Sequence, residues 1–280
     1  MAATPEQAKC VEQLKEWIIR QPHLPNNLDD ILILRFAHSC YYDLDKAKKT
    51  VDLFFTVRGA CSDLISNRDP KSPHMQKVFK TIKVAKYSAS GNKMIWAHQI
   101  NDPGLENYDY ILDAKLFFIS TDARFLEGEN LPEEDIVLID VKDLTMRFLT
   151  KINLSAARRL AKYQEEAIPI RLKQVHVVNA PSFIDKIFGV VKPFLKKEIT
   201  DLIHFHPPKS ETLYKYLSKE DLPTDFGGTQ PSIAETMEET ISLIMKHRDQ
   251  LIDENLWRLV DKKKNGGPVD VGSFRSLAID

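Results

Sequence analysis

Four consecutive apolar residues, Ile136-Val137-Leu138-Ile139, place the strongest constraint on the fold of this chain. A strand with one face in water alternates apolar and polar side chains, whereas a strand covered on both faces is apolar throughout. The run therefore predicts a central strand that has other structure packed on each side of it.

The segments around this run alternate in character. Short apolar stretches, which predict strands, alternate with longer stretches in which apolar residues recur at helical spacing. The predicted strands are residues 94–100, 136–140, 174–178 and 203–206, and the predicted helices are residues 110–126, 154–168 and 181–195. Because β-α-β units join parallel strands through right-handed crossovers, we predict an α/β protein with a mostly parallel sheet.

The N-terminal part of the chain carries helix start signals instead. Thr4, Pro5 and Gln7 form a capping box with proline at the first helical position. Asn27 is predicted to cap a second helix and Asp43 a third. These signals predict a small helical bundle.

The polar segment 66–73, with prolines at positions 70 and 73, is the predicted linker. We therefore predict a helical domain at residues 1–70 and an α/β domain at residues 71–250, which ends in a helix after Pro231. Residues 251–280 are predicted to hold the end of that helix and a loose tail, because a lysine run beside two glycines is typical of frayed chain.

Charge and composition limit the classes of partner. Lys and Arg number 39 against 40 Asp and Glu, so the net charge of −1 provides no overall attraction for nucleic acid. No basic and apolar leader is seen at the N-terminus, and no apolar run is long enough to span a bilayer. Three cysteines without C-x-x-C spacing are typical of reduced core thiols. We expect a cytoplasmic protein that does not bind nucleic acid.

Sequence motifs of the common enzyme classes are missing. Neither G-x-G-x-x-G nor G-x-x-x-x-G-K-[ST] occurs, and neither G-x-S-x-G nor H-E-x-x-H is present. The sequence therefore predicts no catalytic site, no metal site and no cofactor.

Three isolated features leave two interpretations each. His204 and His206 point to the same face of a predicted strand, which suits either a metal pair or a structural role. Asp140 ends the central strand, where it is either an active-site carboxylate or a cap of the next turn. Cys40 beside His38 is either a catalytic pair or part of the helical core.

Residues 181–195, PSFIDKIFGVVKPFL, are predicted to form an unusually apolar helix with one narrow polar stripe. Pro193 has no backbone N–H to donate, and the carbonyl that loses its partner belongs to Gly189, itself a poor helix former. Two weaknesses therefore coincide in one turn. From periodicity alone the segment is either a movable lid or a kinked core helix.

Three segments resemble the CRAL-TRIO lipid-binding family, in particular the branch that contains the α-tocopherol transfer protein and the cellular retinaldehyde-binding protein. They are Leu34-Arg35-Phe36 with Asp43-Leu44-Asp45-Lys46-Ala47; Val175-His176-Val177-Val178-Asn179 with Pro181, Val191-Lys192-Pro193-Phe194-Leu195 and Ile203-His204-Phe205-His206; and Leu222-Pro223 with Phe226-Gly227-Gly228. The segments occur in the expected order and cover most of the chain.

The resemblance implies a helical domain followed by a sheet with flanking helices that enclose an apolar pocket, and a helix that acts as the gate of this pocket. The pocket residues implied by alignment to the family are Phe117, Phe118, Thr121, Val137, Ile139, Ile168, Ile170, Leu172 and Val175. The gate residues implied in the same way are Phe183, Ile184, Ile187, Phe188, Val191, Phe194 and Leu195.

The resemblance also implies a basic cleft for phosphoinositide headgroups, and here the chain departs from the family. Arg171 and Lys173 occupy the first two cationic positions, but Glu198 and Leu202 occupy the second two. The neighbouring cations Lys196 and Lys197 are the candidate substitutes.

Our first hypothesis from the resemblance is a monomeric, non-enzymatic intracellular carrier of one small hydrophobic molecule, such as a tocopherol, retinoid or carotenoid, with transient contacts to membranes. Burial of roughly 400 Å² of ligand surface would contribute about 10 kcal/mol before entropic costs, so the pocket must open for release. The alternative is a lipid- or phosphoinositide-sensing module that regulates membrane or protein docking. A third hypothesis is an enzyme that acts on a lipid.

Overall fold

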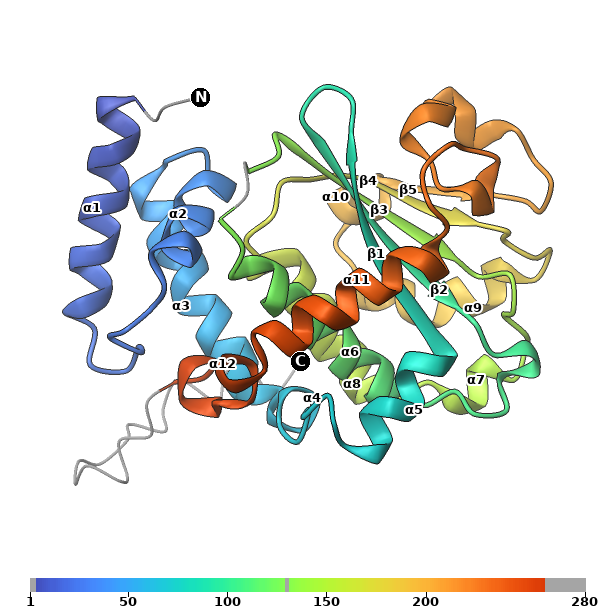
Figure 1. Ribbon diagram of the computed structural model, residues 1–280, viewed down its shortest axis with the longest axis horizontal. Coiled ribbons are helices and arrows are strands. Elements are labelled where there is room, and N and C mark those ends of the chain that lie inside the picture. Colours follow the sequence, from blue (N-terminus) through green and yellow to red (C-terminus); the bar gives the residue numbers. More distant parts are fainter. Residues whose placement is uncertain (1–3, 129–130, 260–280) are drawn as a thin grey trace.

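The computed structural model describes residues 4–128 and 131–259. Three packed helices, α1 (Pro5–Ile19), α2 (Asp30–Ser39) and α3 (Leu44–Ala60), form the predicted N-terminal bundle at one end of the molecule (Figure 1). The predicted caps at Thr4 and Asp43 are present. The prediction for Asn27 is wrong, because the side chain of Asp29 accepts the hydrogen bond from the Ile31 N–H.

Two short helices, α4 (Ser62–Ile65) and α5 (Pro73–Thr81), flank the predicted linker. The linker does not run free, since Arg68 within it is buried and donates hydrogen bonds to the Asp122 carboxylate and the Leu251 carbonyl. The prediction from polarity failed at Arg68 because its charge is neutralised by a partner far away in sequence. The division into domains at residue 70 stays a prediction.

Five strands form one sheet in the order β1 (Ile82–Ala89), β2 (Lys93–Ile100), β3 (Glu134–Asp140), β4 (Leu172–Val178) and β5 (Ile203–His206). The β1–β2 pair is an antiparallel hairpin, and all later pairs are parallel. The structure confirms the predicted mostly parallel α/β sheet. Strand β1 was missed, because Lys83 and Lys86 interrupt its apolar pattern.

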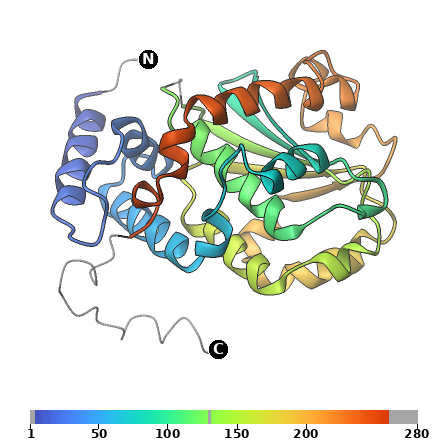
Figure 2. The ribbon, with the colours of Figure 1, turned by 60° about the horizontal axis from the view of Figure 1, so that its bottom comes forward.

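The sheet is covered on both faces, as the apolar run in β3 predicts. On one face Ile136 and Leu138 pack against C-terminal side chains from a series of short segments. These segments are η3 (Thr212–Lys215), η4 (Lys219–Asp221) and η5 (Thr224–Phe226), and the helix α11 (Ile233–Lys246) follows them. Figure 2 shows the strands lying between this C-terminal part, in orange and red, and the helices in green and yellow.

The other face of the sheet carries the side chains of Val137 and Ile139 and is covered by the helices that connect the strands. They are η1 (Pro103–Leu105), α6 (Tyr110–Phe125), α7 (Phe148–Lys151), α8 (Leu154–Glu166), α9 (Ile184–Val191), η2 (Lys192–Phe194) and α10 (Lys197–Thr200). Side chains of α6, α7, α8, α9, η2 and α10, together with this face of the sheet, line the space in which the candidate site lies.

The described chain ends in α12 (Arg248–Ile252) and η6 (Glu254–Leu256), after which Trp257 is buried. Residues 251–280 were predicted to hold the end of a helix and a loose tail. The lysine run and the two glycines of that tail follow residue 259 and lie outside the described residues. Over the described chain, no helix combines the length and the apolar character needed to cross a bilayer.

Candidate functional site

A cavity of about 440 Å³ lies between the sheet and helices α6, α8 and α9. Because side chains alternate along a strand, most of the strand residues in the cavity floor are two positions apart, and Ala85, Ala97 and Leu172 also line the cavity. The residues with the alternating spacing are Val84, Lys86, Trp96, His98, Ile100, Val137, Ile139, Val175, Val177, Ile203 and Phe205. Nearly all of them are apolar, so the floor suits a hydrocarbon ligand.

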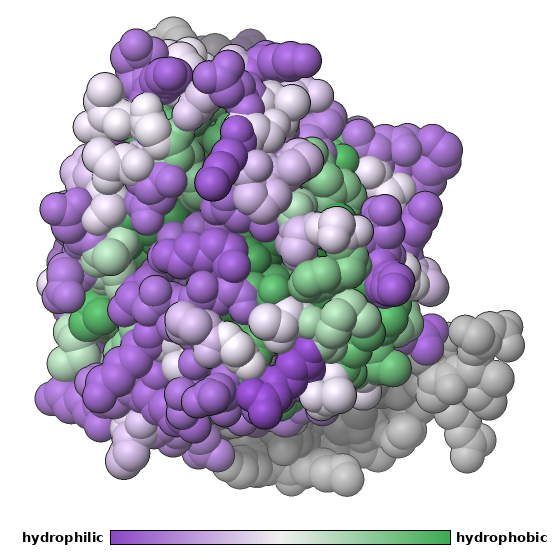
Figure 3. All heavy atoms as spheres, turned by 90° about the vertical axis from the view of Figure 1, so that its right-hand side faces the viewer, coloured by the Kyte–Doolittle hydropathy of each residue, from purple (hydrophilic) through white to green (hydrophobic). Residues whose placement is uncertain are grey.

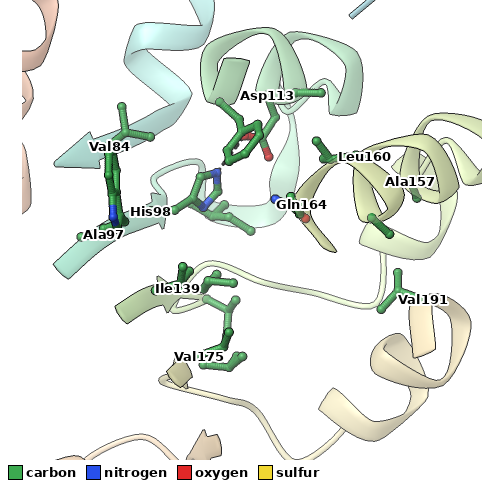
Figure 4. A pocket seen from close by; sticks show the side chains of 18 of the residues that line it. Val84, Ala97, His98, Asp113, Ile139, Ala157, Leu160, Gln164, Val175 and Val191 are labelled. Carbon is green, nitrogen blue, oxygen red and sulfur yellow. Dashed lines mark hydrogen bonds and ion pairs between the residues drawn. The ribbon is translucent and has the colours of Figure 1, made fainter. Parts of the chain in front are cut away.

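The helices close the cavity from the opposite side. Phe117 and Thr121 project from α6, and Ala157 and Leu160 project from α8. Figure 4 shows Ala157, Leu160 and Gln164 of α8 on one side of the cavity and Ile139 of the sheet on the other. The small side chain of Ala157 leaves room that a larger residue would fill.

Eight of the nine implied pocket residues line this cavity, although their role as ligand contacts stays a prediction. The eight are Phe117, Thr121, Val137, Ile139, Ile168, Ile170, Leu172 and Val175. Phe118 does not line it. Its ring is fully buried against the ring of Tyr163, with centroids 4.7 Å apart, and beneath the guanidinium of Arg58. Adjacent residues on a helix point about 100° apart, so Phe117 and Phe118 face different surroundings.

The gate segment, residues 181–195, forms the third wall. Ile184, Ile187, Phe188, Val191, Phe194 and Leu195 line the cavity. Phe183 precedes the first turn of α9 and packs against the neighbouring core instead. The edge of the Phe188 ring meets the Phe205 ring on the floor, with centroids 5.2 Å apart. This ring contact joins the gate segment to strand β5 of the sheet.

The helix in the gate segment is shorter than the predicted residues 181–195. Helix α9 ends at Val191, where the Lys192 N–H donates to the Phe188 carbonyl, and the chain continues as the 3₁₀ turn η2 around Pro193. Gly189 is exposed, and a methyl group added there would meet no atom within 4 Å. The end of the molecule that includes this region presents a mixture of polar and apolar side chains (Figure 3).

His98 and Asp113 form a polar pair in the wall of the cavity, and no sequence motif predicted this pair. His98 Nε2 lies 2.7 Å from Asp113 Oδ1 (Figure 4). The Tyr108 hydroxyl donates to Asp113 Oδ2 at 2.8 Å. Burial lowers the pKa of His98, but the Asp113 carboxylate and its hydrogen bond outweigh burial, so this pKa is raised above 6.5. His98 and Asp113 come from a strand and a helix start, so only the fold brings them together.

Arg171 requires a correction, because the structure does not present it to a membrane surface. Its side chain is buried, Nε donates to the His38 carbonyl at 2.9 Å, and Nη1 forms an ion pair with Glu133. The guanidinium also lies over the ring of Tyr41, with 4.0 Å between its central carbon and the ring centroid. Arg171 therefore joins the sheet to the N-terminal bundle, and the spacing along the strand did not reveal these partners.

The other three implied headgroup cations are also engaged, although they are more exposed. Lys173 Nζ donates to the Tyr41 hydroxyl at 2.9 Å. Lys196 forms an ion pair with Glu166, and Lys197 forms one with Asp201. Exposed pairs of this kind exchange readily for other partners, so a phosphoinositide role for these lysines stays a prediction.

The isolated polar residues from the sequence fall into structural networks. Asp140 accepts hydrogen bonds from the Lys142 N–H and from the amides of Gln99 and Asn179. His204 and His206 stand beside His176, whose Nδ1 lies 3.0 Å from His206 Nε2.

Burial and the neighbouring histidines lower the pKa of His176 to about 3, which keeps its ring neutral. No three His, Cys, Asp or Glu side chains among residues 4–128 and 131–259 are placed to hold a metal ion.

In the N-terminal bundle, Cys40 Sγ lies 3.3 Å from Thr50 Oγ1, and His38 packs against Tyr42.

Comparison with protein families gives two matches. Residues 4–75 match the family described as "Pinta-like, UBA domain", and residues 114–228 match the CRAL/TRIO domain. The second range holds most of helix α6, strands β3 to β5 and the gate segment, all of which line the cavity.

Individual proteins are also similar to this chain over most of its length. The alpha-tocopherol transfer protein-like protein of Homo sapiens is 23% identical over 220 residues, which cover 78% of this chain and 64% of the relative, so less than two thirds of that relative is matched. Clavesin-1 of Xenopus laevis is 25% identical over 227 residues, covering 79% and 68%. The crystal structure of Sfh5 covers 89% of this chain and 99% of its own, with 11% identity and a TM-score of 0.47.

Proposed function

Because this chain belongs to the CRAL-TRIO family, we propose that it binds one small hydrophobic molecule in the cavity and transfers it between membranes without chemical change. The observation that supports this proposal best is the 440 Å³ cavity with its predominantly apolar walls. Cavities of this volume are in the range that holds one drug-sized ligand.

The gate segment supports transfer rather than permanent storage. It covers the cavity with apolar side chains, yet its helix is short, contains Gly189 and ends at a 3₁₀ turn around Pro193. Such an element opens at a lower cost than a long uninterrupted helix. We propose that the ligand enters and leaves when this segment moves, and that tocopherol-, retinoid- and carotenoid-like molecules are the first classes to test.

The test is to extract the purified protein with organic solvent, identify co-purified lipids by mass spectrometry, and measure their transfer between donor and acceptor liposomes. Ala157→Phe places a ring into the cavity and is expected to reduce both bound lipid and transfer about tenfold or more. Ser155→Phe, two residues earlier on the exposed side of α8, is the matched control and should behave like the wild type.

The melting temperature of each variant shows whether the fold is intact. Equal lipid content and equal transfer rates in a folded Ala157→Phe variant and the wild type would contradict the carrier proposal.

A further inference from the structure

His98, Asp113 and Tyr108 form a hydrogen-bonded group in a cavity wall that is otherwise mostly apolar. The His98 side chain is 24% exposed and the Asp113 side chain 15%. His98 lies on β2, an inner strand of the sheet, where its register partners Val84 and Ile139 also line the cavity. The exposed surface of the His98–Asp113 pair therefore faces the cavity, where a ligand can contact it (Figure 4).

The donors of this group are engaged within the group itself. His98 Nε2 lies 2.7 Å from Asp113 Oδ1, and the Tyr108 hydroxyl donates to Asp113 Oδ2 at 2.8 Å. Burial disfavours a charged ring, but Asp113 and a hydrogen bond between the ring and the His98 backbone outweigh burial and raise the pKa of His98. The protonated ring is therefore favoured, and its N–H groups, like the Tyr108 O–H, are occupied.

The Asp113 carboxylate, in contrast, can accept more hydrogen bonds than it receives. A carboxylate accepts about four, whereas Asp113 accepts one on each oxygen from the part of the chain that the structure describes. Acceptor positions that face an apolar cavity without a partner are costly, and a donor on the ligand would offset this cost. A hydroxyl group supplies such a donor, whereas the oxygen of an aldehyde, ether or ester only accepts.

Other polar side chains in the cavity wall are less suited to select a hydroxyl. The hydroxyl groups of Ser120, Thr121 and Thr240 donate to backbone carbonyls of the surrounding helices and of β1. Gln164 of α8 is exposed and lines the cavity (Figure 4). Because its neutral amide both donates and accepts, Gln164 can bind a hydroxyl and a carbonyl alike. Selection of a hydroxyl over a carbonyl is therefore expected of Asp113.

On the basis of the proposed carrier function, we propose that the cavity takes a hydrophobic alcohol or phenol whose free hydroxyl donates a hydrogen bond to the Asp113 carboxylate. The apolar walls then hold the hydrocarbon part of the ligand. A site of this kind rejects an analogue that lacks the donor, because the carboxylate is left facing a group that only accepts. Asp113 is thus the residue that determines specificity for the polar group of the ligand.

The experiment compares alcohols with aldehydes of the same skeleton, retinol with retinal and cis-parinaryl alcohol with cis-parinaraldehyde. Quenching of tryptophan fluorescence measures their affinity for the full chain, because Trp96 lines the cavity. We expect each alcohol to bind about tenfold more tightly than its aldehyde. Equal affinities, or tighter binding of the aldehydes, would overturn the hydroxyl assignment while leaving the carrier function standing. If none of these compounds binds, the carrier function fails as well, and the assignment fails with it.

Asp113→Asn replaces the charged acceptor by an amide that also donates, so the preference for alcohols should fall to about twofold or less. Asp109→Asn makes the same change at the exposed N-cap of α6, outside the cavity lining, and should keep the preference. Gln164→Leu should also keep it. The melting temperature shows whether each variant is folded. A preference that survives in a folded Asp113→Asn variant, or that is lost in a folded Gln164→Leu variant, would overturn the assignment.

Discussion

Arg58 of α3 and Asp122 of α6 form a two-point ion pair inside the protein, with Nη1–Oδ1 2.9 Å and Nη2–Oδ2 2.6 Å, and neither side chain is exposed. Arg58 also donates to the Tyr163 hydroxyl at 3.2 Å and to the Trp257 carbonyl at 3.1 Å, and Arg68 donates to the same Asp122 carboxylate. The Asp122 carboxylate therefore connects Arg58 of α3 and Arg68 to helix α6, which lines the cavity. Arg58 extends this connection to Trp257 near the end of the described chain.

Asp122→Asn is expected to lower the free energy of unfolding by about 3–5 kcal/mol, because two buried guanidinium groups lose their counter-charge. Urea unfolding followed by circular dichroism measures this loss. Asp63→Asn is the matched control, since its ion pair with Arg159 is partly exposed and contributes about 0–1 kcal/mol. Similar losses in the two variants would show that the buried network does not join these elements.

Phe188→Asp is expected to increase the rate of ligand release about tenfold or more while preserving the fold. The substitution places a charge against the cavity and removes the ring contact with Phe205. Release to acceptor liposomes measures the rate. Val190→Asp introduces the same charge into α9 at a position outside the cavity lining, and it should change the rate much less. An unchanged release rate in Phe188→Asp would contradict the gate assignment.

The architecture could be predicted to a large extent because its signals are local. The apolar run at Ile136 predicts a strand buried on both faces, and the β-α-β order predicts parallel pairing. Strand β1 was not predicted because Lys83 and Lys86 interrupt its apolar pattern, and Lys86 faces the cavity rather than a continuous core. When a charged residue interrupts an alternating apolar pattern, the pattern no longer shows which face of the strand is buried.

The site was less predictable because its polar residues depend on long-range partners. His98 meets Asp113 only after β2 and α6 pack together, and Arg171 meets the His38 carbonyl only after the N-terminal bundle docks on the sheet. The resemblance implied that Arg171 is one of the headgroup-binding cations, whereas the tertiary contacts bury its side chain.

Gly189→Ala is expected to slow ligand release. A methyl group at this position meets no neighbouring atom, and alanine stabilises a helix by about 0.5–1 kcal/mol relative to glycine. If opening requires the last turns of α9 to unwind, the release rate should fall about twofold to fivefold with little change in equilibrium affinity. Stopped-flow transfer measurements test this, and an unchanged or faster rate would indicate that the gate moves without unwinding there.

Arg171→Ala is expected to destabilise the protein by about 2–4 kcal/mol, because it leaves buried hydrogen-bond partners unsatisfied at the junction with the N-terminal bundle. Lys173→Ala, at the exposed neighbour, should cost less than about 1 kcal/mol. Liposome flotation with and without phosphoinositides, at a temperature where both variants are folded, should show no headgroup-dependent loss that is specific to Arg171→Ala. A large specific loss would return Arg171 to the membrane surface.

The His98–Asp113 pair predicts a pH dependence of stability with a definite sign. The folded-state pKa of His98 is raised above the ordinary value of 6.5, so folding favours the protonated ring. This stabilisation is complete below about pH 6.5 and is lost as the pH rises through the folded-state pKa. The difference in unfolding free energy between the wild type and His98→Gln should therefore be larger at about pH 6 than at about pH 9. Urea unfolding at both pH values measures the difference, and NMR titration of the His98 ring reports its pKa directly. A pKa below 6.5, or an advantage of the wild type that grows with pH, would show that burial outweighs Asp113.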